Sequence, residues 1–252
     1  MSKSISVSPR AARPATDRDG NSVSNRILLS LPSRECGQIL SRLEFVRLKL
    51  HQVLHEPGET IKSCYFVNAG LMSVLAVQPD GRMVEVGLIG REGLVGLPLL
   101  VGYSNGPTRV MVQADGTAYR CDAASLKELV QRFPELERGL HRFAYQLAMQ
   151  TTQIAACNRL HDVVERLARW ILMSQDRILT LKLPLTQEFL AQMLGTRRSS
   201  VTVAAGALQR AGLISCTRGS VTILNRKELE MAACDCYRIV RQQLKDWEAE
   251  LT

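Results

Sequence analysis

The sequence predicts an α+β fold with three parts in order: an N-terminal antiparallel β-roll of the jelly-roll type, a long helix, and a C-terminal winged helix-turn-helix domain. Three observations support this order. Short apolar runs separated by glycines fill residues 44–122, a helical periodicity follows from Pro134, and two helices and a hairpin come near the end. Strands favour short runs between turn residues, whereas helices repeat apolar positions every three or four residues. We therefore expect the roll in residues 26–134, the long helix in 135–159 and the last domain in 160–252.

The N-terminal region differs from the rest in composition. Residues 1–25 are rich in Ser, Arg and Pro and lack the apolar core of a secretory signal, so they are predicted to be a disordered tail. Residues 25–43 have the spacing of helices, with Pro32 starting a new turn. No apolar stretch approaches the roughly 18 residues that span a membrane. We expect a cytoplasmic protein without membrane contact.

Strands are predicted wherever β-branched and apolar residues form short runs in the glycine-rich region. The runs are Tyr65–Val67, Met72–Leu75, Met83–Val86 and Arg109–Val112. Asp80–Gly81 lies between two of them, and an Asp-Gly pair is a strong signal for a tight hairpin turn. Many short antiparallel strands with regular turns favour a sandwich or jelly roll.

The long helix is predicted to begin at Pro134, where the missing N–H of proline costs nothing. Its apolar stripe consists of Leu136, Leu140, Phe143, Leu147, Thr151 and Ile154. This stripe could pack on the roll of its own chain. A long helix that leaves a compact β domain more often pairs with its twin, so we predict a two-fold dimer interface. The interface is predicted at Leu140, Phe143, Leu147, Thr151 and Ile154. A second helix is expected near residues 160–177.

Residues 185–226 contain the most informative pattern of the chain. Thr186 suits the N-cap of a first helix, and Gly195 suits a tight turn into a second helix. Ala191 and Val201 supply the small and the buried β-branched residue that a helix-turn-helix needs. The pattern therefore predicts a helix-turn-helix, although an ordinary helical hairpin has similar local signals.

The second helix of this motif opens with basic and hydroxyl residues and no acid, which suits contact with base edges and phosphates. A hairpin follows it, with strands near 213–216 and 221–224 and Arg218 at its tip, as in a DNA-binding wing. We expect double-stranded DNA to contact Arg197, Arg198, Ser199, Ser200, Thr202 and Arg218. The net charge of +8 and the isoelectric point of about 9.3 fit a polyanionic partner.

The cysteines predict reduced thiols rather than a disulfide framework, because the seven are odd in number and scattered. Cys234 and Cys236 are the only close pair. Two ligands in a Cys-x-Cys pair without a nearby His are poor spacing for zinc, so no metal site is expected, and the role of the pair stays open. The four histidines are spread over different elements and are expected at the surface.

The order of β-roll, long helix and winged helix-turn-helix resembles the Crp/Fnr family of bacterial transcription regulators. The resemblance extends over residues 27–229 and depends on the helix-turn-helix and on three further segments. These are Glu56–Glu59, Cys64–Gly70 and Asp162–Ala168. It implies a homodimer that binds a palindromic operator, contact with RNA polymerase, and a small-molecule or redox signal sensed in the roll.

The resemblance also limits which signal to expect. Family members that bind cAMP carry Gly-Glu-Leu-Gly and a later Arg followed by Ser or Thr, where this chain has Gly93-Leu94-Val95-Gly96 and a displaced Arg109. The glutamate that fixes the ribose is thus absent, and a one-residue shift in a strand turns a side chain to the other face. Thr151 and Thr152 lie where those members contact the purine. The effector residues implied by the resemblance are Gly93, Leu94, Arg109, Thr151 and Thr152, with cAMP not expected as the ligand.

An iron–sulfur cluster is not expected either, because oxygen-sensing members carry cysteines near the N-terminus and this chain has none before Cys36. No cofactor is identified. On the recognition helix, Ser199 and Val203 replace a Glu and an Arg of the best-known members, which predicts a different operator. Arg198 matches the base-reading arginine of the family, whereas Arg197 is an added charge suited to a phosphate.

Two other classes of function compete with a regulator. The first is an enzyme with an appended DNA-binding module and its chemistry in residues 44–122, but the chain lacks Gly-x-Gly-x-x-Gly, P-loop and His-Glu-x-x-His motifs, so we expect no enzyme. The second is an effector-binding scaffold that acts only through protein contacts. A salt-dependent shift of promoter DNA would exclude the second class.

Overall fold

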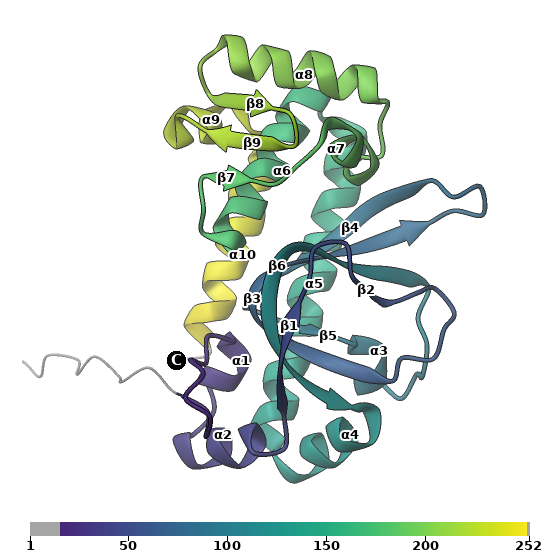
Figure 1. Ribbon diagram of the computed structural model, residues 1–252, viewed down its shortest axis with the longest axis vertical. Helices are drawn as coiled ribbons and strands as arrows, with labels where there is room; N and C mark the ends of the chain where they lie inside the picture. The colour runs from purple at the N-terminus through teal and green to yellow at the C-terminus, as the bar shows by residue number, and fades with distance from the viewer. Residues whose placement is uncertain (1–15, 251–252) are drawn as a thin grey trace, which may run out of the picture.

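The computed structural model describes residues 16–250 and confirms the predicted α+β class and the order of its parts (Figure 1). The helices are α1 (Arg26–Leu29), α2 (Ser33–Leu40), α3 (Leu97–Leu100), α4 (Ala123–Arg132), α5 (Pro134–Leu160), α6 (Val163–Ile178), α7 (Gln187–Met193), α8 (Arg198–Arg210), α9 (Arg226–Ala232) and α10 (Asp235–Glu250). The strands are β1 (Glu44–Leu48), β2 (Val53–His55), β3 (Ser63–Val77), β4 (Met83–Ile89), β5 (Leu94–Val95), β6 (Thr108–Asp122), β7 (Lys182–Leu183), β8 (Ile214–Thr217) and β9 (Ser220–Ile223).

The roll is one antiparallel sheet with the strand order β1-β6-β3-β4, to which β2 adds on β6 and β5 adds on β3. The runs Tyr65–Val67 and Met72–Leu75, expected as two strands, belong to the single long strand β3. The predicted hairpin at Asp80–Gly81 joins β3 to β4, with Gly81 at a φ of +83°. The sheet packs against α5 through β4.

Much of the apolar stripe of α5, which was predicted as a dimer interface, packs against its own chain, and the dimer interface itself stays a prediction. Leu140, Phe143 and Ile154 are buried: the first two lie in the core of the roll, and the Phe143 ring also contacts Trp247 of α10, with the centroids 6.2 Å apart. Helix α10 runs back along α5 (Figure 1). Leu147 and Thr151 face Gly87 of β4. The apolar stripe therefore joins α5 to its own roll and to α10.

The N-terminal segment also differs from the expectation of a disordered tail over residues 1–25. Residues 1–15 lie outside the described residues, but the segment from residue 16 onward packs on the roll. Val23 is buried, and the fully buried Asn25 amide donates to the carbonyl oxygens of Val67 and Gly93. Asn25 also caps α1 through Leu28. Composition alone missed these long-range contacts.

A second core joins the roll to the C-terminal domain. Residues of β3 and β4 share it with α6, α7 and α8. At its centre the buried Glu85 of β4 accepts hydrogen bonds from Trp170 Nε1 (2.8 Å) and from Ser73 Oγ (2.7 Å). Burial raises the pKa of Glu85 to about 7, although Ser73, Arg169 and Trp170 oppose that shift. The two domains therefore form one packed unit in this structure.

A buried ion pair also crosses this boundary. Arg177 Nε of α6 lies 2.6 Å from Glu92 Oε1, and both side chains are 3% exposed. The same carboxylate oxygen accepts the Gly90 N–H at 3.1 Å. A Cβ at Gly90 would lie 2.7 Å from the Glu92 carboxylate and 2.9 Å from Arg177, so only glycine allows this close approach.

Candidate DNA-binding surface, effector pocket and cysteine–histidine cluster

The helix-turn-helix is formed by α7, the turn at 194–197 and α8. Thr186 Oγ1 accepts the Phe189 N–H and so caps α7. Gly195 takes a φ of +57°, and its missing side chain leaves room for Val84 of β4, since a Cβ would lie 2.9 Å from Val84 Cγ2. Ala191 and Val201 are buried between the helices. Each residue type that suggested the motif thus has the predicted place in it.

The start of α8 is open and positively charged. Arg197 is its N-cap and offers no side-chain hydrogen bond to the helix, so no side chain caps the N–H groups of the first turn. Arg197, Arg198 and Ser199 are exposed and Ser200 is half-buried. Arg198 lies at 3.9 Å from Glu188, a weak exposed pair that a stronger anion can displace. The helix dipole adds to this preference for negative charge.

Two neighbouring residues one turn further along α8, Thr202 and Val203, are also exposed. Thr202 is exposed, and its hydroxyl lies 2.8 Å from Gln187 Oε1 and 3.0 Å from the Arg198 carbonyl oxygen. Val203, which replaces an arginine of the best-known relatives, is 68% exposed. An exposed valine on a recognition helix suits a thymine methyl group rather than a guanine.

The wing consists of β8 and β9, with Arg218 exposed at the turn and Gly219 at a φ of +86°. Strand β7 pairs with β9 as a third strand, which the sequence did not predict. Arg198 and Arg218 line one groove between α7, α8 and the wing. A phosphate backbone in this groove would meet positive charge from both sides.

The β3–β4 hairpin lies beside the start of α8. An open groove has Asp80 and Arg82 of the hairpin on one side and Arg197 and Arg198 on the other. The hairpin therefore lies close to the surface that DNA would use.

Most of the effector residues implied by the resemblance make contacts within the chain itself. Leu94 is fully buried in the core of the roll, and a Cβ at Gly93 would lie 2.1 Å from the Phe143 ring. Arg109 Nε is held by Glu56 Oε2 at 2.7 Å. Thr151 and Thr152 donate their hydroxyls to the carbonyl oxygens one turn earlier in α5, at 3.0 Å each. The chain thus uses these positions for packing and pairing.

An apolar pocket lies elsewhere on the roll, between α3, the loop before β6 and α5. Its volume is about 680 Å³. Its lining residues include Leu97, Pro98, Leu100, Val101, Tyr103, Pro107 and Ala144. Val101 and Tyr103 are strongly exposed for apolar side chains. An apolar run, Leu97–Val101, comes directly after Gly96 and could have indicated this surface from the sequence. Its place opposite Ala144 follows only from the fold.

A second group of residues was missed because its members are far apart in the chain. This cysteine–histidine cluster consists of Cys157, His161, Cys234 and Cys236, whose ligand atoms all lie within 4.8 Å of one another. The expectation of no histidine near the Cys-x-Cys pair is therefore wrong, and so is the surface assignment of His55, which is buried on β2. A hydrogen bond from Cys234, together with the nearby Arg169, lowers the pKa of the Cys157 thiol to about 5. The same contact raises the pKa of Cys234.

Comparison with known families matches both domains. The cyclic nucleotide-binding domain model matches residues 45–133, and the model of the Crp-like helix-turn-helix domain matches residues 165–232. Together with the geometry of α7, α8 and the wing, these matches define a DNA-binding regulator of transcription with a sensor-type β-roll. The chain belongs to the Crp/Fnr family.

Curated proteins that are similar to this chain are also regulators. The transcriptional regulator LdrP of Thermus thermophilus is 25% identical over 200 residues, which cover 74% of this chain and 95% of that protein. The nitrogen fixation regulation protein FixK of Bradyrhizobium diazoefficiens is 24% identical over 192 residues, with 70% and 79% covered. These relatives are transcription regulators rather than enzymes. In the described residues, 16–250, no helix is long and apolar enough to cross a membrane.

Solved structures support the fold alone. A CRP/FNR-family regulator from Thermus thermophilus superposes with a TM-score of 0.64 at 23% identity, covering 75% of this chain and 98% of that one. CLP, a c-di-GMP-responsive global regulator from Xanthomonas campestris, gives a TM-score of 0.65 at 18% identity, with 76% and 99% covered.

Proposed function

We propose that the protein binds a palindromic operator as a homodimer, with Arg198 reading a base and Arg197 holding a phosphate. The observation that carries the proposal is the acid-free start of α8, where both arginines are exposed and no side chain caps the helix. The wing adds Arg218 to the same surface. Two-fold symmetry then requires half-sites about one helical turn apart. Contact with RNA polymerase, as expected for the family, belongs to the same proposal.

We expect Arg198→Ala to cost about 1–3 kcal/mol on the operator and to relax the preference at one guanine per half-site, because its fork can bridge both guanine acceptors. Arg197→Ala should weaken binding to operator and random DNA alike and lower the salt slope by about one charge per subunit. Fluorescence anisotropy at several salt concentrations, on operator and scrambled DNA, separates the two effects.

The matched control is Arg210→Ala, since Arg210 is exposed at the opposite end of the same helix. This variant should bind both DNAs as the wild type does. Equal losses on operator and scrambled DNA for Arg198→Ala would contradict its assignment as the base reader.

We place the proposed dimer interface on the outer face of α5, which the rest of the chain leaves exposed. Tyr145, Ala148, Thr152 and Ala155 are all exposed, and their spacing of three and four residues is that of a coiled-coil seam. Two small alanines on this face permit close approach of two helices. Thr152, which the resemblance implied as an effector residue, therefore lies on the proposed dimer face.

The effector proposed for the roll is a small molecule other than cAMP that fits the apolar pocket beside α3. The pocket is lined mainly by carbon, whereas the positions that would hold a cyclic nucleotide are occupied by buried Leu94 and by the Arg109–Glu56 pair. An apolar pocket favours a ligand with a substantial apolar body.

Isothermal titration with cAMP is expected to show no binding in the micromolar range, because no glutamate stands at position 94 and Glu56 already neutralises Arg109. Glu56→Gln, which frees Arg109, is the matched variant and should still show no micromolar binding of cAMP, because it also lacks a glutamate at position 94. A micromolar isotherm for the wild type would overturn this expectation and show that Arg109 and the two threonines form a site together.

A further inference from the structure

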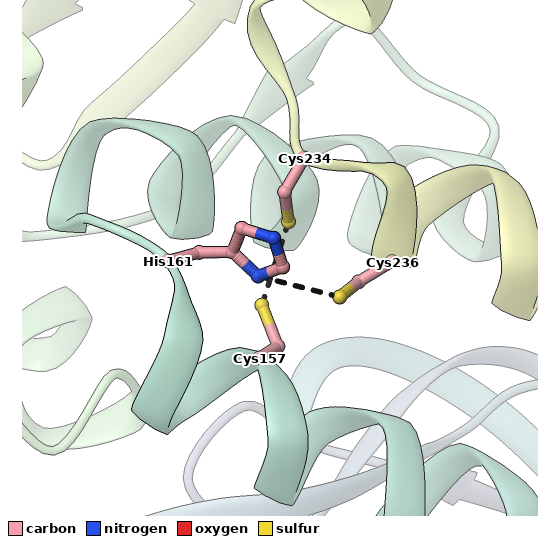
Figure 2. A group of neighbouring side chains, drawn as sticks. All are labelled: Cys157, His161, Cys234 and Cys236. Atoms are coloured by element: carbon pink, nitrogen blue, oxygen red, sulfur yellow. Dashed lines mark hydrogen bonds between the residues drawn. The ribbon is translucent and has the colours of Figure 1, made fainter.

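The cysteine–histidine cluster lies where three parts of the chain meet. Cys157 lies near the end of α5, His161 follows that helix at its C-cap, and Cys234 and Cys236 flank the start of α10 (Figure 2). Because α10 runs antiparallel to α5, its first turn lies opposite the last turn of α5 (Figure 1). The four residues therefore link the sensor-side helix, the entry to the DNA-binding domain and the C-terminal helix.

Two distances in the cluster are close to those between ligands of one small ion, and all four ligand atoms lie within 4.8 Å of one another. Cys157 Sγ lies 3.4 Å from Cys234 Sγ, and Cys236 Sγ lies 3.5 Å from His161 Nδ1 (Figure 2). A tetrahedral zinc ion with bonds of about 2.3 Å to sulfur and about 2.0 Å to nitrogen places its ligand atoms about 3.5–3.8 Å apart. An iron–sulfur cluster distributes its ligands over more than one iron, so it needs them farther apart.

Two buried cations lie beside the cluster. Arg166 and Arg169 are on α6, with exposed fractions of 8% and 2%, and they are close enough for their charges to act on the cysteines. Within residues 16–250 neither guanidinium forms a salt bridge. Arg166 donates to the Leu194 carbonyl oxygen and Arg169 Nη1 donates to Met173 Sδ at 3.3 Å, while the Nε of each has no hydrogen-bond partner. A buried cation needs a counter-charge. Three thiolates around a divalent ion carry a net single negative charge and would supply it.

A further contact resembles the outer shell of a thiolate site. Gln153 Nε2 donates to Cys236 Sγ at 3.1 Å, from one turn before Cys157 on α5. Such N–H···S contacts orient metal-bound sulfur and tune its basicity. The three cysteines are buried, whereas His161 is half-buried and leaves a path for the ion. We propose that the cluster binds one zinc ion in a tetrahedral Cys₃His site.

This zinc site would fix the junction between α5 and α6 to the start of α10. Structural zinc sites with four protein ligands are closed and contribute folding energy. Here the ion would hold the orientation of the DNA-binding domain on the helix that we propose to dimerise. The inference is independent of DNA recognition, since no ligand lies on α8 or the wing.

The first test is the metal content of the untagged full-length protein. Mass spectrometry of the desalted protein should find about one zinc per chain, as for a closed structural site. Apoprotein reconstituted with Co²⁺ should show thiolate-to-cobalt charge transfer and the intense visible bands of tetrahedral cobalt. The proposal would be overturned if the purified protein contained no zinc and its apo form gave no such bands with Co²⁺. Iron with labile sulfide, or a Cys157–Cys234 disulfide in place of metal, would also overturn it.

The second test compares variants by chelator competition for Zn²⁺. His161→Ala and Cys236→Ser should weaken zinc binding by about tenfold or more. Their matched controls are His141→Ala, an exposed histidine on the same helix, and Cys216→Ser, a half-buried cysteine on the wing. Both controls should retain full zinc affinity. Equal affinity in all four variants would overturn the site even if the protein contained zinc. If Arg198→Ala still weakens operator binding in zinc-free protein, the DNA-binding proposal holds whatever the outcome for zinc.

Discussion

Replacing Glu92 with alanine is expected to lower the free energy of unfolding by about 3–5 kcal/mol, because Arg177 would remain buried without its counter-charge. Only the Met173 carbonyl, 3.1 Å from Arg177 Nη1, would still accept from the guanidinium. Gly90 would also lose the acceptor of its N–H. Urea unfolding followed by circular dichroism measures the loss.

The matched control for this variant is Glu128→Ala, which removes the exposed partner of Arg42. An exposed pair contributes about 0–1 kcal/mol, so this variant should be nearly as stable as the wild type. The double variant Glu92→Met with Arg177→Met should recover most of the loss, since apolar groups of similar volume need no counter-charge. If Glu92→Ala and Glu128→Ala cost the same, the roll and α6 do not pack in solution as they do here.

The DNA-binding domain was predictable because its signals are local. Thr186 caps α7 by accepting the N–H of a residue only three positions later, and Gly195 supplies the positive φ that the turn between α7 and α8 needs. A hairpin turn such as Asp80–Gly81 is equally local. These features depend on backbone sterics and on hydrogen bonds between near neighbours, so one sequence is sufficient to place them.

What periodicity cannot show is which surface covers an apolar face. The stripe through Leu140 and Phe143 was identified correctly as apolar, but its spacing could not show that the roll and Trp247 of α10 cover it. The cysteine–histidine cluster escaped detection for a related reason. Seventy-seven residues separate Cys157 from Cys234, and only the antiparallel packing of α5 and α10 brings them together.

The outer face of α5 leads to the prediction with the largest effect on function. Ala148→Glu is expected to convert the proposed dimer to a monomer of 28.0 kDa, because two carboxylates would face each other across the two-fold axis. Ala148 is exposed in the chain, so the fold of each subunit should remain intact. Leu147→Glu is a poorer choice, since Leu147 packs against β4 and the variant would report on folding.

Loss of the dimer should weaken operator binding by about 10²–10⁴-fold, because two linked half-site contacts become two separate events. Sedimentation velocity gives the mass, anisotropy gives the operator affinity, and circular dichroism verifies the fold. Ala124→Glu is the matched control, since it places the same charge at an exposed alanine in the first turn of α4, where the helix dipole favours it. A dimeric Ala148→Glu protein would show that the interface lies away from this face. A monomer with undiminished operator affinity would show that a single subunit is sufficient for recognition.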